Sequence, residues 1–341
     1  MIAHEIILNV SGLTTWQECE RLYSYSYLHG YRSQYDNDPI TFGNWTHYAL
    51  RLVAMGSTYA DALAKTLKRQ IEMEVKSGEA ARPELWVMFV NLMSAHELWQ
   101  QKSDNLYTDS KLEYLNVEET FSFEFGGYKF KGTWDGIAKH KHLGGLYLVE
   151  RKTTANPNDL EKGINYDFQP RVYAWAAEQV YQEPVVGVIY EIIRRTDPTT
   201  TKILKNGWPS KARNELDGTT LEVYSNLLFD TADKLGYTYE TVLIDYAEQL
   251  AYLKLNHNPV FRRVLVPMPT RYKEMAAKTL LFRAAQMAAA QGMGEDLPPK
   301  LNRYSCPKCP FKYACLAQDD GADYISLLDA TFVKGKERFD A

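Results

Sequence analysis

Apolar and polar positions follow a helical period in the first third of the chain and a strand period after it. Apolar residues recur every three or four positions over 11–32, 41–75 and 82–102, which is the spacing of an amphipathic helix. The second of these helices is expected to begin near Phe42 or Gly43. The first third of the chain is therefore predicted to be helical.

The first of these helices opens with residues that favour a helix start. Thr14 and Thr15 are the candidate N-caps. Gln17 and Glu18 lie three residues beyond them, and such a side chain can return a hydrogen bond to the cap. Cys19 would then lie one turn inside this helix.

The pattern next changes to the alternation expected of strands. Apolar and polar residues alternate over 118–140 on both sides of Gly126 and Gly127, which predicts a β-hairpin. Residues 146–154 are expected to form a third strand after a turn-like segment, and residues 184–195 a buried strand. These segments are predicted to build the core sheet.

Helical spacing returns between and after the last strands. Pro170 falls inside the helical range 158–182, so it must sit near a first turn or kink the helix. Residues 196–219 are rich in Thr, Lys, Gly and Pro and are expected to form a loop or insertion. The remaining elements are helices at about 238–256 and 269–291 with a strand between them, 259–268. This order predicts an α/β fold in which a core sheet carries a helical N-terminal part.

Composition indicates a folded protein with a sizeable core. Of the 341 residues, 45% are hydrophobic and 24% are charged, which excludes a disordered chain. The net charge of −4 argues against a protein that coats nucleic acid through phosphate contacts alone, but not against an enzyme with a basic channel. Because the sequence has neither an apolar run of about 18 residues nor a basic, cleavable leader, a cytoplasmic protein is expected.

Two of the predicted strands carry charged residues where the surrounding pattern is apolar. Asp135 follows Trp134, and Glu150 and Lys152 close the run Leu146–Val149. A charge in a core strand is costly unless it is paired or binds a metal. Residues two apart in a strand share a face, so Glu150 and Lys152 project together. Asp135 on the neighbouring strand can lie opposite them.

Two carboxylates and a lysine suit a hard divalent cation that polarises water. Mg²⁺ prefers oxygen ligands and keeps several of its waters, so two carboxylates are enough. The lysine can position the attacking water or stabilise negative charge that grows on a phosphate. An isolated Glu-x-Lys is more often an exposed ion pair, so the neighbouring motifs decide between the two interpretations.

The chain has four cysteines, and three of them fall within ten residues of one another. They are Cys19, Cys306, Cys309 and Cys315. In a cytoplasmic protein this spacing indicates a metal site rather than disulfides. Four thiolates suit an iron–sulfur cluster and equally a zinc ion.

Two further pairs of residues flank the acidic strands. Gly43 and His47 lie four apart on the upstream helix, and Gln169 and Tyr173 lie four apart on the downstream helix. Each pair therefore shares one helical face. Taken alone, His47 would be an ordinary helix histidine and Tyr173 a core aromatic.

Taken together, these motifs resemble the PD-(D/E)XK nuclease superfamily, and within it the branch of RecB-like nucleases and CRISPR-associated adaptation exonucleases. The resemblance spans about residues 11–318 and implies a restriction-endonuclease-like core, with a central mixed sheet flanked by helices. The motifs stand in the order of that branch: Gly43 and His47, then Asp135, then Glu150-Arg151-Lys152, then Gln169 and Tyr173.

The resemblance also implies a role for each residue of the acidic motifs. His47, Asp135 and Glu150 would hold Mg²⁺ or Mn²⁺, with the backbone carbonyl of Arg151 as a further ligand. Lys152 would serve the attacking water. One departure is that Trp134, rather than a proline, precedes the aspartate, which this branch tolerates.

The remaining motifs have implied roles as well. Gln169 and Tyr173 would orient the site and contact DNA. The four cysteines would hold a [4Fe–4S] cluster between segments 14–29 and 304–318 and so staple the two chain ends together, with zinc as the alternative. This is the pattern of the iron–sulfur members of the branch.

The chain is longer than the compact CRISPR-associated members that it resembles. We expect a single nuclease domain over 1–341, with insertions at about 70–115 and 196–260. No P-loop of the G-x-x-x-x-G-K-[ST] type is present, so any unwinding of DNA must come from a partner. Members of this branch include both monomers and rings, so the resemblance is consistent with a monomer and with an oligomer.

The predicted function is a metal-dependent DNA nuclease. We expect an exonuclease that acts on single-stranded DNA or DNA ends, in recombination, repair or phage DNA processing. One alternative is the nuclease subunit of a helicase–nuclease or of a CRISPR adaptation complex. The other is a non-catalytic module that binds DNA.

Overall fold

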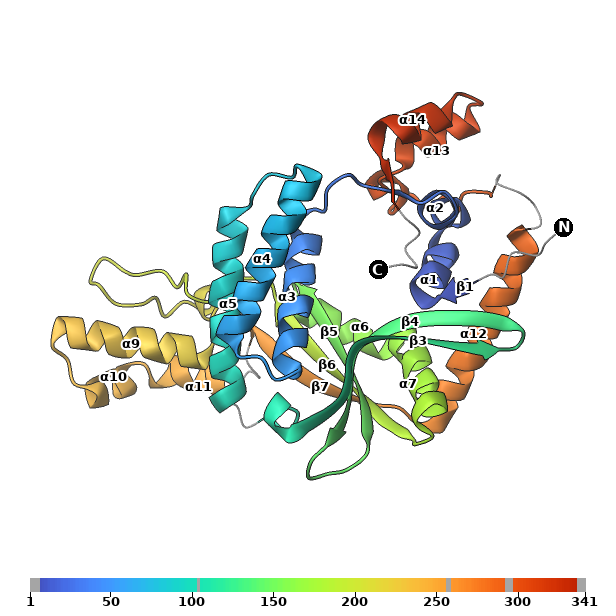
Figure 1. Cartoon of the computed structure of the whole chain (residues 1–341). Helices are drawn as coiled ribbons and strands as arrows, with labels where there is room; N and C mark the ends of the chain where they lie inside the picture. The colour runs from blue at the N-terminus through green and yellow to red at the C-terminus, as the bar shows by residue number, and fades with distance from the viewer. Residues whose placement is uncertain (1–6, 103–104, 256–258, 292–296, 336–341) are drawn as a thin grey trace.

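A mixed sheet runs through the middle of the molecule (Figure 1). The computed structural model describes residues 7–102, 105–255, 259–291 and 297–335. Within these residues the sheet has the strand order β3-β4-β5-β6-β7, with β1 beside the first part of β4. The strands are β1 (Ile7–Asn9), β3 (Leu112–Phe125), β4 (Tyr128–His140), β5 (Leu146–Thr154), β6 (Val185–Arg194) and β7 (Phe261–Pro267).

The predicted hairpin and the strands that follow it are confirmed. β3 and β4 are antiparallel and turn at Gly126 and Gly127. Both glycines have positive φ, 59° and 82°, a conformation that a glycine adopts without steric cost. β5 pairs antiparallel with β4 and parallel with β6, and β7 is antiparallel to β6. The sheet is therefore mixed, as expected.

Three helices form a layer over one face of the sheet: α3 (Asp38–Ala54), α4 (Tyr59–Ser77) and α5 (Pro83–Lys102). Their apolar side chains, among them Phe42 and Phe89, pack against Ile193 of β6 and Phe261 of β7. The region 70–115, expected to be an insertion, contributes α5 and the second half of α4 to this layer. α3 is the member of the layer that lies against β5.

The opposite face is covered by α1 (Val10–Glu18), α7 (Phe168–Tyr181) and α12 (Thr270–Gln291). Leu148 of β5 and Phe130 of β4 are fully buried here against these helices. The sheet is thus sandwiched between two helical layers (Figure 1). None of the helices in the described residues has the length and apolar character that crossing a lipid bilayer requires.

The prediction of one helix over 41–75 is wrong in two respects. It begins earlier, at Asp38, because Asn37 caps the Ile40 N–H and Pro39 falls in the first turn. It is also broken into α3 and α4, since Gly56 takes a φ of +95° between them. Thr58 then caps α4 through the Asp61 N–H.

The first helix also differs from its prediction. Asn9 is its N-cap, and the helix ends at Glu18. Cys19 therefore lies in an extended break with φ −165°, outside the helix and before α2 (Glu20–Tyr23). A π-helical turn, η1 (Ser24–Leu28), follows.

The range 158–182 is interrupted as the proline suggested. α6 (Pro157–Gly163) and a 3₁₀ turn, η3 (Ile164–Tyr166), precede α7. Pro170 lies in the first turn of α7, where its missing N–H costs nothing. Asp167 caps this new helix start by accepting the Gln169 N–H.

Residues 213–255 fold into a small helical projection at the left of Figure 1. It has its own apolar core, which includes Tyr224, Leu228 and Tyr246. α9 was not predicted, and the helix expected over 238–256 is two helices, with residue 256 outside the described part. The helices are α8 (Arg213–Leu216), α9 (Leu221–Leu235), α10 (Tyr239–Asp245) and α11 (Ala247–Leu255).

Residues 20–32 and 304–335 pack together in a unit that we call the terminal lobe (Figure 1). Two short strands, β2 (Tyr31–Arg32) and β8 (Val333–Lys334), pair antiparallel within it. Its C-terminal part contains η4 (Cys306–Lys308), α13 (Lys312–Asp319) and α14 (Tyr324–Thr331). Arg21 donates to Asp319 at 2.6 Å. This contact joins two residues that lie nearly 300 positions apart in the sequence.

Candidate active site

The acidic residues lie where β4 and β5 part. The paired register of these strands stops at Gly136 and Val149, and the next residues along are Asp135 and Glu150. Beyond the last register pair, the Arg151 N–H donates to the side chain of Asp135, at Oδ2, with a distance of 2.6 Å. The strand parting therefore holds the Asp135 carboxylate against the backbone of β5.

Glu150 and Lys152 project together on one face of β5, as alternation predicts. Lys152 Nζ lies 2.5 Å from Glu150 Oε1, and the glutamate side chain is only 4% exposed. Burial, and then the nearby charge of Asp135, raise the pKa of Glu150 to about 7. Burial alone would lower the pKa of Lys152, but the Glu150 carboxylate holds it above its usual value.

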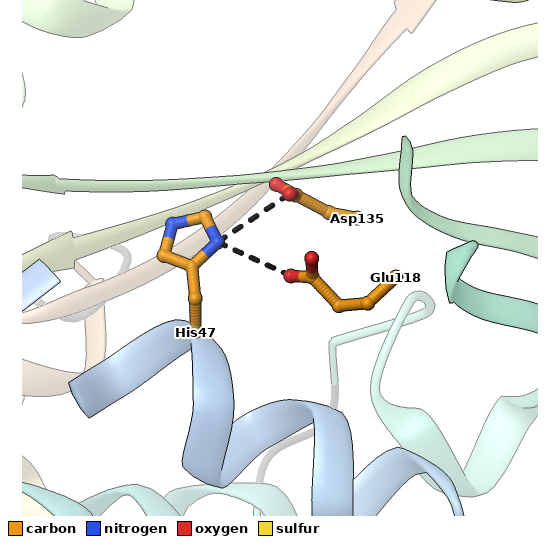
Figure 2. Close-up of side chains that lie close together, drawn as sticks. All are labelled: His47, Glu118 and Asp135. Carbon is orange, nitrogen blue, oxygen red and sulfur yellow. Dashed lines mark ion pairs between the residues drawn. The ribbon is translucent and has the colours of Figure 1, made fainter. Parts of the chain in front are cut away.

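His47 reaches the parting from α3 and faces two carboxylates (Figure 2). Its Nδ1 lies 3.4 Å from Asp135 Oδ1 and 3.6 Å from Glu118 Oε1. Burial opposes protonation of the ring, but the two acids outweigh burial and raise the pKa of His47 to about 10. In turn, the ring and the Arg151 N–H hold the pKa of Asp135 below its usual value although burial alone would raise it.

Glu118 is the site residue that sequence reasoning missed. It lies on β3 between the register pairs Val117–Gly136 and Glu119–Trp134, and so opposite Asp135. Its φ of +52° is unusual for a residue other than glycine, and its Oε1 is buried without a hydrogen-bond partner. The ligand atoms of Glu118, His47 and Asp135 all lie within 4.8 Å of one another.

A glycine brings the helix that carries His47 close to the sheet. A Cβ added to Gly43 would lie 3.2 Å from Thr153 Oγ1 on β5, which is tighter than an ordinary contact. Because His47 is one turn further along the same face of α3, the close approach at Gly43 lets the imidazole reach Asp135. The lack of a side chain at Gly43 therefore determines how closely His47 approaches the acidic residues.

The downstream pair lies together on α7. Gln169 Nε2 donates to the Tyr173 hydroxyl at 3.1 Å, and the Tyr173 ring packs edge-on against Phe121. Burial raises the pKa of Tyr173 to about 12, so this hydroxyl stays neutral. Gly132 of β4 leaves room for both rings, because a Cβ there would lie 3.0 Å or less from Phe121 and Tyr173.

The four cysteines gather in and beside the terminal lobe. Burial raises the pKa of the Cys309 thiol, and the three other cysteines are close enough to raise it further. Among the described cysteines, no three sulfurs lie within 4.8 Å of one another, whereas four sulfurs on one zinc ion would lie about 3.8 Å apart. Arg21 Nη1 donates to Cys315 Sγ at 3.4 Å.

Comparison with known proteins gives a family for nearly the whole chain. A family model of the PD-(D/E)XK nuclease superfamily matches residues 7–316. This range includes the sheet, both helical layers, the side chains at the strand parting and the four cysteines. No curated protein matches the chain.

Proposed function

The chain belongs to the PD-(D/E)XK nuclease superfamily, and we propose that it hydrolyses DNA with a divalent cation held at the parting of β4 and β5. The observation that carries the proposal is the convergence of His47, Glu118 and Asp135 within 4.8 Å, beside the Glu150–Lys152 pair. Each of these side chains comes from a different element, except that Glu150 and Lys152 share β5.

The donor set fits Mg²⁺ or Mn²⁺. Carboxylate oxygens dominate it, and these are the ligands that hard divalent cations take. Without a cation, Asp135 and Glu150 cannot both ionise easily, as the raised pKa of Glu150 records. We propose His47, Glu118, Asp135 and Glu150 as side-chain ligands and the Arg151 carbonyl as a backbone ligand.

The chain's own residues divide the remaining work. When bound, the cation supplies an activated water and neutralises charge on the scissile phosphate. Lys152 is held as a cation by Glu150, so it serves as a positive charge that orients water and stabilises the growing negative charge, not as a free base. We propose that Gln169 and Tyr173, joined by the hydrogen bond between them, orient the site from α7 and contact DNA.

The RecB-like order of the motifs supports an exonuclease that acts on single-stranded DNA or DNA ends, with DNA as the partner. For the cysteines we propose a [4Fe–4S] cluster. The split of one distant and three local cysteines, together with the nuclease motifs, supports the cluster, and a zinc ion held by the same four thiolates is the alternative. The cytoplasmic location expected from the sequence stays a prediction.

The Lys152→Ala variant distinguishes an enzyme from a DNA-binding module. Binding of a fluorescent single strand should stay within about twofold of wild type, measured by anisotropy in Ca²⁺, because a single lysine that is already paired with Glu150 contributes little to affinity. Cleavage of end-labelled DNA in Mg²⁺ should fall by about 10²-fold or more. Wild-type protein that binds DNA with cation present and cuts no strand would establish the binding module instead.

A further inference from the structure

The middle residue of the Glu150-Arg151-Lys152 motif turns its side chain away from the proposed metal site. Alternation along β5 sends the Arg151 guanidinium to the face opposite Glu150 and Lys152, under the layer of α3, α4 and α5, where it is 1% exposed. An arginine this deeply buried is rare unless it is paired. The hydrogen-bond partners of the Arg151 side chain therefore indicate its role.

The Arg151 guanidinium connects its own strand, β5, to three others beneath the parting: β3, β4 and β6. Nη1 donates to the Asp135 carbonyl at 3.3 Å, and Nη2 donates to the Tyr114 hydroxyl at 3.1 Å. Nε donates to Glu191 Oε2 of β6 at 3.0 Å. Beyond the end of the β4–β5 ladder, the hydrogen bond from this side chain to the Asp135 carbonyl links the two strands.

Glu191 is the anion at the centre of this buried network. Its Oε1 accepts from Arg263 Nη2 at 2.7 Å and lies 3.0 Å from His96 Nε2. With Nε2 protonated, His96 donates to Glu191, and its Nδ1 accepts from the Tyr59 hydroxyl at 2.8 Å. Although burial opposes ionisation, Arg263, His96 and Arg151 hold the pKa of Glu191 well below its usual value.

Two connections lead from this network to the metal site. The Arg151 main chain holds Asp135 Oδ2 through its N–H, and the Arg151 side chain holds the Asp135 carbonyl. Asp135 is thus fixed at its carboxylate and at its backbone by the same residue. Partners that orient metal ligands in this way contribute about 10- to 100-fold to metal affinity or activity.

We propose that Arg151 and Glu191 are a positioning pair that holds Asp135 and the Arg151 main chain in the geometry that the divalent cation requires. This inference rests on the proposed metal-dependent nuclease. It assigns the pair no contact with DNA or with the reacting atoms. Its effect should therefore fall on metal binding and on the maximal rate at limiting metal, and not on DNA affinity.

The test compares Arg151→Lys and Glu191→Gln with wild type. Lysine keeps the charge but loses the planar fork of donors, and glutamine keeps the shape but loses the charge. Both should bind Mn²⁺ about 10- to 100-fold more weakly, measured by the EPR signal of free Mn²⁺. The KM for DNA should stay within about twofold, and excess Mn²⁺ should restore the rate, as it would not for a residue that touches the reaction.

Tyr114→Phe is the milder variant, in case the charged substitutions prevent folding. It removes only the hydroxyl, which accepts from Arg151 and donates to Asp109 at 2.8 Å, and it should weaken Mn²⁺ binding about fivefold. Lys273→Gln is the matched control, because Lys273 of α12 is 3% exposed and pairs with Glu178 of α7 on the far face of the sheet. It should lower thermal stability and leave Mn²⁺ affinity unchanged.

Folded Arg151→Lys and Glu191→Gln proteins with wild-type Mn²⁺ affinity would overturn the proposal, as would an equal loss of affinity in Lys273→Gln. Wild-type protein that binds Mn²⁺ but cuts no DNA would refute the proposed nuclease and leave the positioning pair to be judged by the Mn²⁺ affinities. Wild-type protein that binds no Mn²⁺ would refute both.

Discussion

Asp135 and Glu150 lie at one strand parting but are held under opposite electrostatic conditions. His47 and the Arg151 N–H favour the ionised form of Asp135. Burial and the charge of Asp135 disfavour the ionised form of Glu150, whose pKa is about 7. In the metal-free protein the imidazolium of His47 thus supplies the positive charge that a divalent cation would supply when bound. Protons and metal ions must therefore compete for this site.

Because of this competition, the stabilisation of the protein by Mg²⁺ should increase with pH. The pKa of Glu150 is raised from 4.5 to about 7 on folding, so the stability linked to its proton is present below about 4.5 and is lost as the pH rises through about 7. Mg²⁺ competes with the protons on Glu150 and on His47, and the group that loses its proton between about pH 5 and about pH 8 is Glu150. The rise in Tm caused by Mg²⁺ should therefore be small near about pH 5 and larger near about pH 8. A shift of equal size at both pH values would contradict this account.

Glu118 provides a second prediction at the scale of single residues. Glu118→Gln removes a charged ligand with little change in shape, so Mn²⁺ affinity should fall by about tenfold. Glu119→Gln is the matched control, since this neighbouring acid is exposed and opposes Trp134 rather than Asp135. Titration of both variants with Mn²⁺ measures the difference. Equal affinities would remove Glu118 from the ligand set.

Strand alternation places Glu150 and Lys152 on one face, and the order of the motifs singled out His47 and Asp135. The structure brings these four side chains to one strand parting. The sequence could not predict Glu118. Its position opposite Asp135 depends on a register shift between Tyr114 and Asn116 and on its own positive φ. Neither feature has a glycine or proline to mark it in the sequence.

At the scale of elements, the distance between α3 and β5 decides whether His47 reaches the acids. Residue spacing predicted the helix and the strand, but only the structure shows that Gly43 meets Thr153 across them. The element boundaries were less predictable. Helix periodicity continues through Gly56 and through Cys19, and each break is made by backbone conformation that periodicity does not record.

Gly43→Ala tests this contact between elements. Alanine adds helix propensity of about 1 kcal/mol, but its Cβ would press on Thr153 Oγ1 at 3.2 Å, and overpacking costs about 1–3 kcal/mol. We expect a small net change in stability and a loss of activity of about tenfold, because α3 and His47 move away from Asp135.

The double variant Gly43→Ala, Thr153→Ala removes the crowded hydroxyl and should recover most of the activity. Gly163→Ala is the control, because an added Cβ there meets nothing within 4 Å. Nuclease rates and thermal melts of the four proteins measure both effects. A double variant no more active than Gly43→Ala would show that the hydroxyl contact is not the cause.

At the scale of the whole molecule, the terminal lobe joins residues 20–32 to residues 304–335, far apart in the sequence. Arg21 forms an ion pair with Asp319 and donates a hydrogen bond to Cys315. The Tyr31 hydroxyl donates a hydrogen bond to Asp329 at 2.6 Å. The resemblance to the iron–sulfur members of the branch led us to expect that these two segments would meet. The projection at 213–255 was less predictable, because its small core is built by helices that pack on one another and not on the sheet.

Cys306→Ala tests the proposed cluster at this scale. A cross-link that closes a loop of this length stabilises by about 3–5 kcal/mol when removal of a disulfide is taken as the guide. We expect the variant to lose most of its iron and to unfold at lower denaturant concentration. Iron and zinc analysis of anaerobically purified wild type is the accompanying measurement. Zinc in place of iron would replace the cluster with a zinc site.

The most direct test of the central claim is cleavage of end-labelled single- and double-stranded DNA by wild type and by Asp135→Ala, each with Mg²⁺, Mn²⁺ or EDTA. The account predicts that wild type degrades DNA only with a divalent cation, releasing short products from an end. It also predicts that the folded Asp135→Ala protein is inactive. Wild-type protein that is folded and leaves every DNA substrate intact with either cation, or an Asp135→Ala variant as active as wild type, would contradict it.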